Sequence, residues 1–198
     1  MTPPIIIIFG DDKLSSLIIN SLSIPDNIVL IKDKSSNLKR VIRLLLKGSI
    51  SIKFLIKTLL CQIKQKSIKL EKIFFTINSN DTLEKIIIQI NPEYIFLFRA
   101  GLIINKKVLD LGIPLINIHC ASLNGFGGLG SIDKALKKEV YNQVATAHIV
   151  TNRIDQGKII AEIPFKLNKN KNYCSNELIA YRTGGKLLQM LIDKDFKI

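Results

Sequence analysis

Cysteine and long apolar runs are scarce in this sequence of 198 residues. The three cysteines, Cys61, Cys120 and Cys174, are widely spaced, which fits neither a disulfide framework nor the paired spacing of a zinc site. No apolar run approaches the roughly 18 residues that a membrane-spanning helix needs. The N-terminal residues also lack the positive segment and cleavage site of a signal peptide. We therefore expect a cytoplasmic protein with free thiols and no metal.

Phosphate-binding glycine motifs are also absent. The turn after the first apolar run contains one glycine, Gly10, followed by two carboxylates, Asp11 and Asp12, which would repel a phosphate. Neither a G-x-G-x-x-G pattern nor a Walker motif occurs in the sequence. A dinucleotide-binding or NTPase function therefore loses its main support.

Acidic residues are few, and the net charge of +13 is unevenly distributed. Residues 32–72 hold twelve basic and two acidic residues, which accounts for ten of the thirteen excess charges. A clustered positive field attracts phosphates or anionic membrane surfaces. The sequence leaves open whether this region binds an anionic partner or is merely solvated.

Hydrophobic residues make up 47% of the chain, enough for a sizeable core. Short apolar runs alternate with helical patterns, which indicates βα units and a mainly parallel sheet. We predict one α/β domain over residues 1–198, a Rossmann-like, three-layer open sheet with helices on both faces. The predicted strands are residues 5–9, 28–31, 73–77, 94–98, 115–118, 146–151 and 158–165. The predicted helices are residues 14–22, 82–90, 106–111, 132–138, much of 38–66, and a last helix capped by Ser175.

The segment 38–66 allows two interpretations because it interleaves Leu and Ile with Lys and Arg. A basic amphipathic helix that touches a membrane surface would show this pattern. So would a pair of helices that covers the sheet and leaves solvated lysines outside. We favour the second interpretation.

The two histidines of the chain, His119 and His148, both lie at strand-like positions beside loops. His119 ends the fifth predicted strand, and period-two alternation places Asn117 on the same face. Ligands of open parallel sheets bind at the carboxyl ends of the strands. Farther on, Asp155 lies on a turn, where its carboxylate could orient an imidazole. Taken alone, such a pattern is more often structural than catalytic.

Three pieces of residues 92–165 resemble, in order, the catalytic half of the folate-dependent formyltransferases. That family includes glycinamide ribonucleotide formyltransferase, methionyl-tRNA formyltransferase and the sugar-nucleotide N-formyltransferases. The matching pieces are residues 102–111 with the Asn-Ile-His of 117–119, Gly128 with residues 134–136, and residues 147–151 with the Asp-x-Gly-x-Ile-Ile turn of 154–160. The resemblance covers somewhat over a third of the chain.

The resemblance implies formyl transfer from 10-formyltetrahydrofolate to a primary amine, without a metal. Asn117 and His119 would stabilise the charge that grows on the formyl oxygen, and Asp155 would fix His119 and help to move the proton of the amine. His148 is expected to be structural, and Cys120 to be a small buried side chain rather than a nucleophile. The pterin is expected between Arg99, Ala100, Gly101, Leu102 and Ile103 on one side and Thr151, Asn152 and Ile154 on the other.

The acceptor site departs from the family pattern. The commonly found Pro-Ser-Leu-Leu-Pro is replaced by Cys-Ala-Ser-Leu-Asn at 120–124, and a glycine-rich turn follows. The purine-pathway enzymes hold the phosphate of the acceptor in a glycine- and serine-bearing first turn, which is Gly10-Asp-Asp here. We therefore expect an amino sugar on a nucleotide or lipid carrier, with its phosphates on the basic region 32–72. Glycinamide ribonucleotide is the second choice.

Other functions on the same fold are less favoured. Nucleic acid is not expected as a partner, because the additional C-terminal domain of methionyl-tRNA formyltransferase is missing from this sequence. A formyltetrahydrofolate hydrolase would use the same Asn, His and Asp with water as the acceptor, but its relatives usually carry a regulatory domain before the catalytic one. Retention of all three polar residues argues against a non-catalytic binding module.

Overall fold

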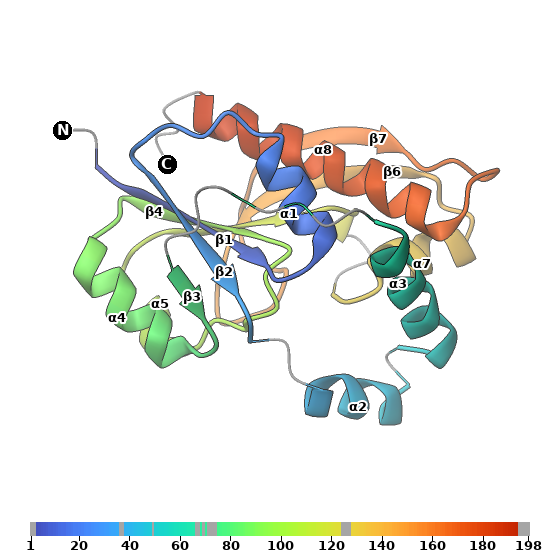
Figure 1. The fold of residues 1–198 in the computed structure, drawn as a ribbon, viewed down its shortest axis with the longest axis horizontal. Helices are drawn as coiled ribbons and strands as arrows, with labels where there is room; N and C mark the ends of the chain where they lie inside the picture. The colour runs from blue at the N-terminus through green and yellow to red at the C-terminus, as the bar shows by residue number, and fades with distance from the viewer. Residues whose placement is uncertain are drawn as a thin grey trace.

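A seven-stranded sheet organises the chain, which we describe from a computed structural model over residues 3–35, 38–48, 50–65, 68, 70, 75–123 and 128–193. The strand order is β3-β2-β1-β4-β5-β6-β7 (Figure 1). The parallel strands are β1 (Ile5–Gly10), β2 (Ile28–Asp33), β3 (Phe75–Ile77), β4 (Tyr94–Phe98) and β5 (Leu115–His119). The antiparallel strands are β6 (Asn142–Ile149) and β7 (Ile159–Lys166). The predicted α/β class and mostly parallel sheet are confirmed.

Helices cover both faces of the sheet because successive strand residues point to opposite sides. Phe9, Phe96 and Phe98 belong to one core cluster, whereas Ile8 and Ile95 belong to the other. The first cluster is completed by side chains of α1 (Lys13–Asn20), α3 (Ile52–Lys64), α7 (Ser131–Lys137) and α8 (Tyr173–Asp193). The second is completed by side chains of α4 (Asn80–Ile90) and α5 (Lys106–Leu109). The result is the predicted three-layer arrangement.

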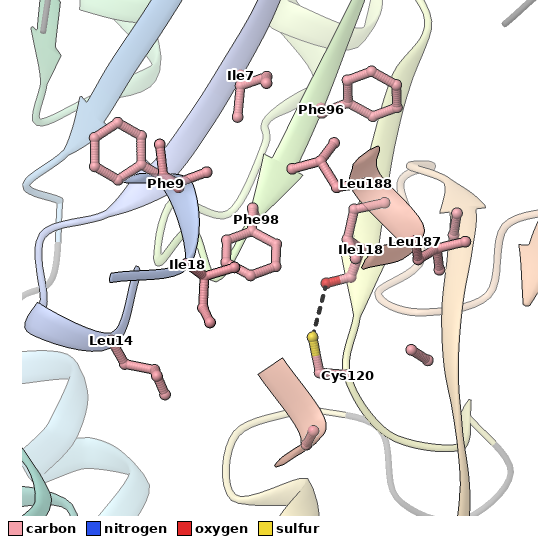
Figure 2. Packing of buried hydrophobic residues seen from close by; sticks show 14 of the residues in the cluster. Ile7, Phe9, Leu14, Ile18, Phe96, Phe98, Ile118, Cys120, Leu187 and Leu188 are labelled. Atoms are coloured by element: carbon pink, nitrogen blue, oxygen red, sulfur yellow. Dashed lines mark hydrogen bonds between the residues drawn. The ribbon is translucent and has the colours of Figure 1, made fainter. Parts of the chain in front are cut away.

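Two adjacent glycines let α8 approach the sheet and α1 closely. A Cβ at Gly184 would overlap the Sγ of Cys120, and a Cβ at Gly185 would lie 2.5 Å from Ile18. Figure 2 shows Cys120 and Ile18 on either side of Phe98 in this cluster. Glycine in a helix interior normally lowers stability by about 1 kcal/mol relative to alanine. Close packing explains why glycine occupies both positions here.

Local capping sets several helix boundaries. Asp12 accepts a hydrogen bond from the Ser15 amide at the start of α1, and Asn91, with φ 48°, ends α4 in the left-handed conformation ahead of Pro92. The predicted cap at Ser175 is wrong, since α8 already begins at Tyr173. The side chain of Asn172 accepts the Ser175 amide at 2.9 Å and so caps the helix one turn earlier.

The segment predicted as helical over 38–66 forms two helices, α2 (Leu38–Leu46) and α3. Figure 1 shows α2 apart from the sheet, joined to α3 at one edge of the molecule. On α3, Phe54 and Cys61 are buried, but several Ile and Leu side chains of both helices are exposed. The favoured interpretation, a pair of helices against the sheet, holds for Phe54 and Cys61 and for the partly buried side chains that pack against the core, which are Val41, Leu44, Leu45 and Leu55. It is wrong for the exposed side chains. Within the described ranges, no helix is long and apolar enough to span a bilayer.

The expectation of free thiols is also wrong for two of the three cysteines. Cys61 of α3 and Cys174 of α8 form a disulfide, with their Cα atoms 5.3 Å apart. The two residues are separated by 113 positions, and only the packing of α3 against the start of α8 brings them together. Sequence spacing carries no sign of such a pair. Cys120 remains a free and buried thiol.

Candidate active site

The pairing of β5 with β6 places Asn117 opposite His148 and His119 opposite Thr146. The Nδ2 atom of Asn117 lies 3.1 Å from Nε2 of His148, and Nδ1 of His148 lies 3.1 Å from the carbonyl oxygen of Ile149. Because a carbonyl can only accept, Nδ1 carries the proton and Nε2 accepts from the Asn117 amide. His148 is buried at 2% exposure, so this contact fixes the orientation of Asn117.

Asn117 and His119 share one face of β5, as predicted. Both side chains are half-buried, whereas Ile116 and Ile118 on the opposite face are fully buried in the α1 and α8 core cluster. His119 ends the strand, at the carboxyl edge of the parallel part of the sheet. The amide and the imidazole therefore lie where an open parallel sheet binds ligands.

The third predicted catalytic residue, Asp155, lies beside His148. Its Oδ1 atom is 3.7 Å from Nε2 of His148, and its Oδ2 atom accepts a hydrogen bond of 2.8 Å from the Gly128 amide. Asp155 has φ 55°, in the left-handed region. Two residues later, a Cβ at Gly157 would overlap the carbonyl of Ile149, so only glycine lets the loop fold back onto β6. The expected pairing of Asp155 with His119 stays a prediction.

The expected pterin segment after β4 is held by two polar side chains that the sequence did not single out. Asp33, at the end of β2, is 2% exposed and accepts hydrogen bonds from the amides of Gly101 at 2.6 Å and Leu102 at 2.7 Å. Asn80, at the start of α4, donates from Nδ2 to the carbonyl of Ile103 at 3.0 Å. The backbone of this segment is thus set by β2 and α4. The available signal for Asp33 was a carboxylate at the carboxyl end of a buried strand.

Arg99 begins this segment with φ 55°, and its side chain points to the helical layer. The guanidinium binds Asp12 at 2.8 Å and Glu177 at 3.0 Å and lies over the ring of Tyr181 at 4.4 Å. Burial acts to lower the pKa of Arg99, but the electrostatic interactions with Tyr181, Asp12 and Glu177 raise it overall. The side chain is therefore a charged link between β4, α1 and α8. Of Arg99, only the backbone is continuous with the expected pterin segment, because the side chain binds Asp12 and Glu177.

The other expected pterin residues differ in how far their side chains are exposed to solvent. Ala100 and Leu102 are partly buried against the α4 and α5 core cluster, whereas Ile103 is 50% exposed. In the facing loop, Thr151 and Asn152 are exposed, and Ile154 is 64% exposed. Exposed apolar side chains at the ends of both segments suit a planar aromatic ligand. That the two segments flank one ligand stays a prediction.

In the first βα turn, two backbone amides that could bind an anion already donate to side chains of the protein. The carboxylate of Asp12 accepts a hydrogen bond from the Ser15 amide, and Oε1 of Gln62 accepts one from the Lys13 amide at 3.1 Å. A cavity of about 220 Å³ lies beside this turn, with Asp11 paired to Lys32 at its rim at 3.3 Å. The helix N-terminus that would attract an anion is therefore already occupied. Among the described residues, no group of three or more His, Cys, Asp or Glu could hold a metal ion.

The profile of the family described as formyl transferase matches residues 26–175. The chain belongs to the formyl transferase family. The matched range contains Asn117, His119, His148 and Asp155.

The chain is also similar to a curated protein over part of its length and, in fold, to solved structures. The formyltetrahydrofolate deformylase of Mycobacterium bovis is 37% identical over 73 residues, 36% of this chain. The match spans 24%, about a quarter, of that relative's length. Phosphoribosylglycinamide formyltransferase from Anaplasma phagocytophilum superposes with a TM-score of 0.67 at 15% identity, over 98% of this chain and 88% of its own. A 4-N formyltransferase from Francisella tularensis superposes with a TM-score of 0.61 at 16% identity, over 97% of this chain and 69% of its own. These two likenesses show a shared fold.

Cys120 follows the Asn-Ile-His of residues 117–119 directly, but it is 4% exposed. Burial raises the pKa of its thiol to about 12, although the charge of Arg99 acts to lower it. Its Sγ atom points to the carbonyl of Ile118, 4.0 Å away (Figure 2). The thiol is thus protonated at neutral pH, which agrees with the prediction of a small core residue rather than a nucleophile.

Proposed function

We propose that this protein transfers a formyl group from 10-formyltetrahydrofolate to a primary amine, with an amino sugar on a nucleotide or lipid carrier as the acceptor. The observation that carries the proposal is the polar group at the carboxyl end of β5, where Asn117 and His119 share a face. His148 lies beside Asn117, and Asp155 lies beside His148. Membership of the formyl transferase family supplies the class of donor.

In the proposed reaction the acceptor nitrogen attacks the formyl carbon, and negative charge develops on the formyl oxygen. An amide nitrogen carries two protons. One proton of Asn117 Nδ2 is directed at His148, so the second is held in a fixed direction for the formyl oxygen. Such preorganised donors stabilise a developing oxyanion without reorganising at the moment of reaction.

His119 acts with Asn117 as the second donor to the oxyanion and exchanges protons. The bond between the acceptor nitrogen and the formyl carbon forms, and the bond from that carbon to N10 of the folate breaks. The proton lost by the attacking amine passes to the departing N10, so tetrahydrofolate leaves as a neutral amine. Asp155, anchored by the Gly128 amide, supports this proton movement.

The first βα turn supports an amino sugar over glycinamide ribonucleotide. Asp12 and Gln62 already take the amides of Ser15 and Lys13, and the carboxylate of Asp12 would repel a phosphate at that position. An acceptor that carries its phosphates elsewhere avoids this conflict. The basic residues of the segment 32–72 offer a place for them.

Hydrolysis of formyltetrahydrofolate is the second candidate function. The observation that favours it is the 37% identity with the deformylase of Mycobacterium bovis over 73 residues. The same polar group would then activate water in place of an amine.

The test is release of tetrahydrofolate by the purified protein from 10-formyltetrahydrofolate. The acceptors are a panel of 3- and 4-amino sugar nucleotides, glycinamide ribonucleotide, and no acceptor at all. We expect turnover with one amino sugar, and we expect His119→Ala to lower it about 100- to 1000-fold, the loss typical of an oxyanion donor. His119 is half-buried, so thermal unfolding of the variant serves as the control for folding.

The other outcomes separate the alternatives. Turnover with glycinamide ribonucleotide would keep the chemistry and reject the acceptor. Release without any acceptor would establish the hydrolase. No release and no folate binding in any arm would reject the proposed function.

A further inference from the structure

The helices α2 and α3 expose an unusual amount of apolar surface. Thirteen large hydrophobic side chains are exposed in the described part of the chain, and seven of them belong to these two helices. The seven are Ile42, Leu46, Ile52, Ile56, Leu59, Leu60 and Ile63. We call them the apolar stripe. A concentration of exposed apolar side chains on neighbouring helices marks a candidate binding surface.

The spacing of the stripe is that of one helix face. On α3, Ile52, Ile56, Leu59 and Ile63 follow one another at intervals of four, three and four, which aligns them along the helix. The buried residues Phe54 and Cys61 lie on the opposite side. The exposed stripe is therefore a second apolar face on a helix that already packs against the core.

A row of cations runs beside the stripe. Five of its seven members are each followed directly by a basic residue, and one position is about 100° around a helix. These basic residues are Arg43, Lys47, Lys53, Lys57 and Lys64. Residues 42–64 contain no acidic residue. The stripe thus has a positively charged flank along both helices.

A cavity at the inner edge of α3 adds to this charge. It has a volume of about 450 Å³ and lies between α3 and the start of α8. Lys57, Lys64, Lys169 and Lys171 line it, with no carboxylate among the lining residues. Lys57 also binds Asp133 at 2.7 Å. The other three lysines place positive charge where anionic groups can approach from the side of the stripe.

We propose that α2 and α3 dock this protein on an anionic membrane surface. The apolar stripe enters the boundary between headgroups and acyl chains, and the flanking cations and the lysine-lined cavity meet the phosphates of the lipids. Figure 1 shows both helices at the edge of the molecule, beyond the sheet, where a flat surface can reach them. Docking of this kind is peripheral and needs no membrane-spanning helix.

Charge decides between a membrane and a second copy of the chain as the occupant. The segment 32–72 carries an excess of ten positive charges. A symmetric dimer through the stripe would bring two such segments together, and like charges would repel across the interface. An anionic bilayer instead gains from every cation that comes near it.

Helix α3 also contacts the first βα turn, where Oε1 of Gln62 accepts a hydrogen bond from the Lys13 amide. A carrier lipid in the same membrane would lie beside this edge of the protein, a point that rests on the proposed function. The docking itself does not rest on it, and its test uses no folate and no acceptor.

The test is co-sedimentation of the full chain with vesicles of phosphatidylcholine alone or with about 30 mol% phosphatidylglycerol, at low and at high salt. We expect binding to the anionic vesicles that falls with salt, and little binding to the neutral ones. Ile63→Asp should lower the partition coefficient at least about tenfold, since it removes an isoleucine that the bilayer would bury and adds a charge that the anionic surface repels.

Ile88→Asp is the matched control. Ile63 and Ile88 are both 65% exposed, and each lies in the last turn of its helix, α3 and α4 respectively. The control should change the partition coefficient by less than about twofold, because an exposed substitution outside the docking surface has little effect.

Three results would overturn the proposal. They are absence of binding to anionic vesicles, equal binding to neutral vesicles, and equal loss in the two variants. Sedimentation velocity without lipid measures the oligomeric state and so tests the alternative occupant. If the protein were a dimer that Ile63→Asp made monomeric, the occupant of the stripe would be a second copy of the chain.

Discussion

The hydrogen bonds that Asp33 accepts from the segment after β4 lead to a quantitative prediction for Asp33→Asn. The buried carboxylate accepts three amide hydrogen bonds, from Gly101 at 2.6 Å, Leu102 at 2.7 Å and Ser35 at 2.7 Å. Asparagine has the same shape but only one accepting oxygen. Whichever way the new side chain turns, its NH2 group faces at least one amide that needs an acceptor.

The least damaging orientation keeps the oxygen towards Gly101 and Leu102 and turns the NH2 group to Ser35. One hydrogen bond to a charged group is lost, which costs about 1.5–3 kcal/mol, and the other two weaken because the acceptor is neutral. We therefore expect the free energy of unfolding to fall by about 2–4 kcal/mol. With a urea m-value of about 2 kcal/mol/M, the midpoint should fall by about 1–2 M.

Urea unfolding followed by circular dichroism measures this shift, with Asp110→Asn as the matched control. Asp110 is an exposed carboxylate that pairs with Lys106 four positions before it, an arrangement worth about 0.3–0.5 kcal/mol. If Asp33→Asn shifted the midpoint no more than Asp110→Asn at an unchanged m-value, the role assigned to Asp33 would be refuted.

Three further predictions concern the packing, the charges and the disulfide. Gly184→Ala should destabilise by about 1–3 kcal/mol because its Cβ overlaps Cys120, and adding Cys120→Ala should recover part of the loss in a double-mutant cycle; additive losses would contradict the overlap. The pKa of Asp133 is lowered, since its hydrogen bonds from Lys137 and Lys57 outweigh the raising effect of burial. Its stabilisation is therefore present above the unfolded pKa of about 3.9 and is lost as pH falls through the lower folded pKa, so the stability gap to Asp133→Asn should close in acid; a gap independent of pH would contradict this. Removing the disulfide by Cys174→Ala should lower the unfolding free energy by about 2–5 kcal/mol under oxidising conditions, and dithiothreitol should abolish the difference from wild type.

Local patterns in the sequence determined much of the sheet. The run of isoleucines in β1 is buried throughout because helices cover both faces of a central parallel strand. The alternation in β5 placed Asn117 and His119 on one face, as the structure confirms. These features depend on neighbours one or two positions away, so they can be read without knowing the rest of the fold.

The partners of the site residues depended on the tertiary structure. The contact of Asn117 with His148 follows from the antiparallel register of β5 and β6, which no local pattern specifies. The link from Asp33 to Gly101 joins residues 68 positions apart. Each contact requires distant strands to be paired first, and side-chain periodicity does not encode that pairing.

The segment 38–66 shows the same division. The sequence by itself determined that its Leu, Ile, Lys and Arg residues form amphipathic helices, because helical periodicity is local. Only the tertiary structure decided which apolar face is covered. The core accommodates Phe54 and Cys61 of α3, where Cys61 meets Cys174, and leaves Ile63 exposed, because one helix side can contact the body of the protein while the other faces away.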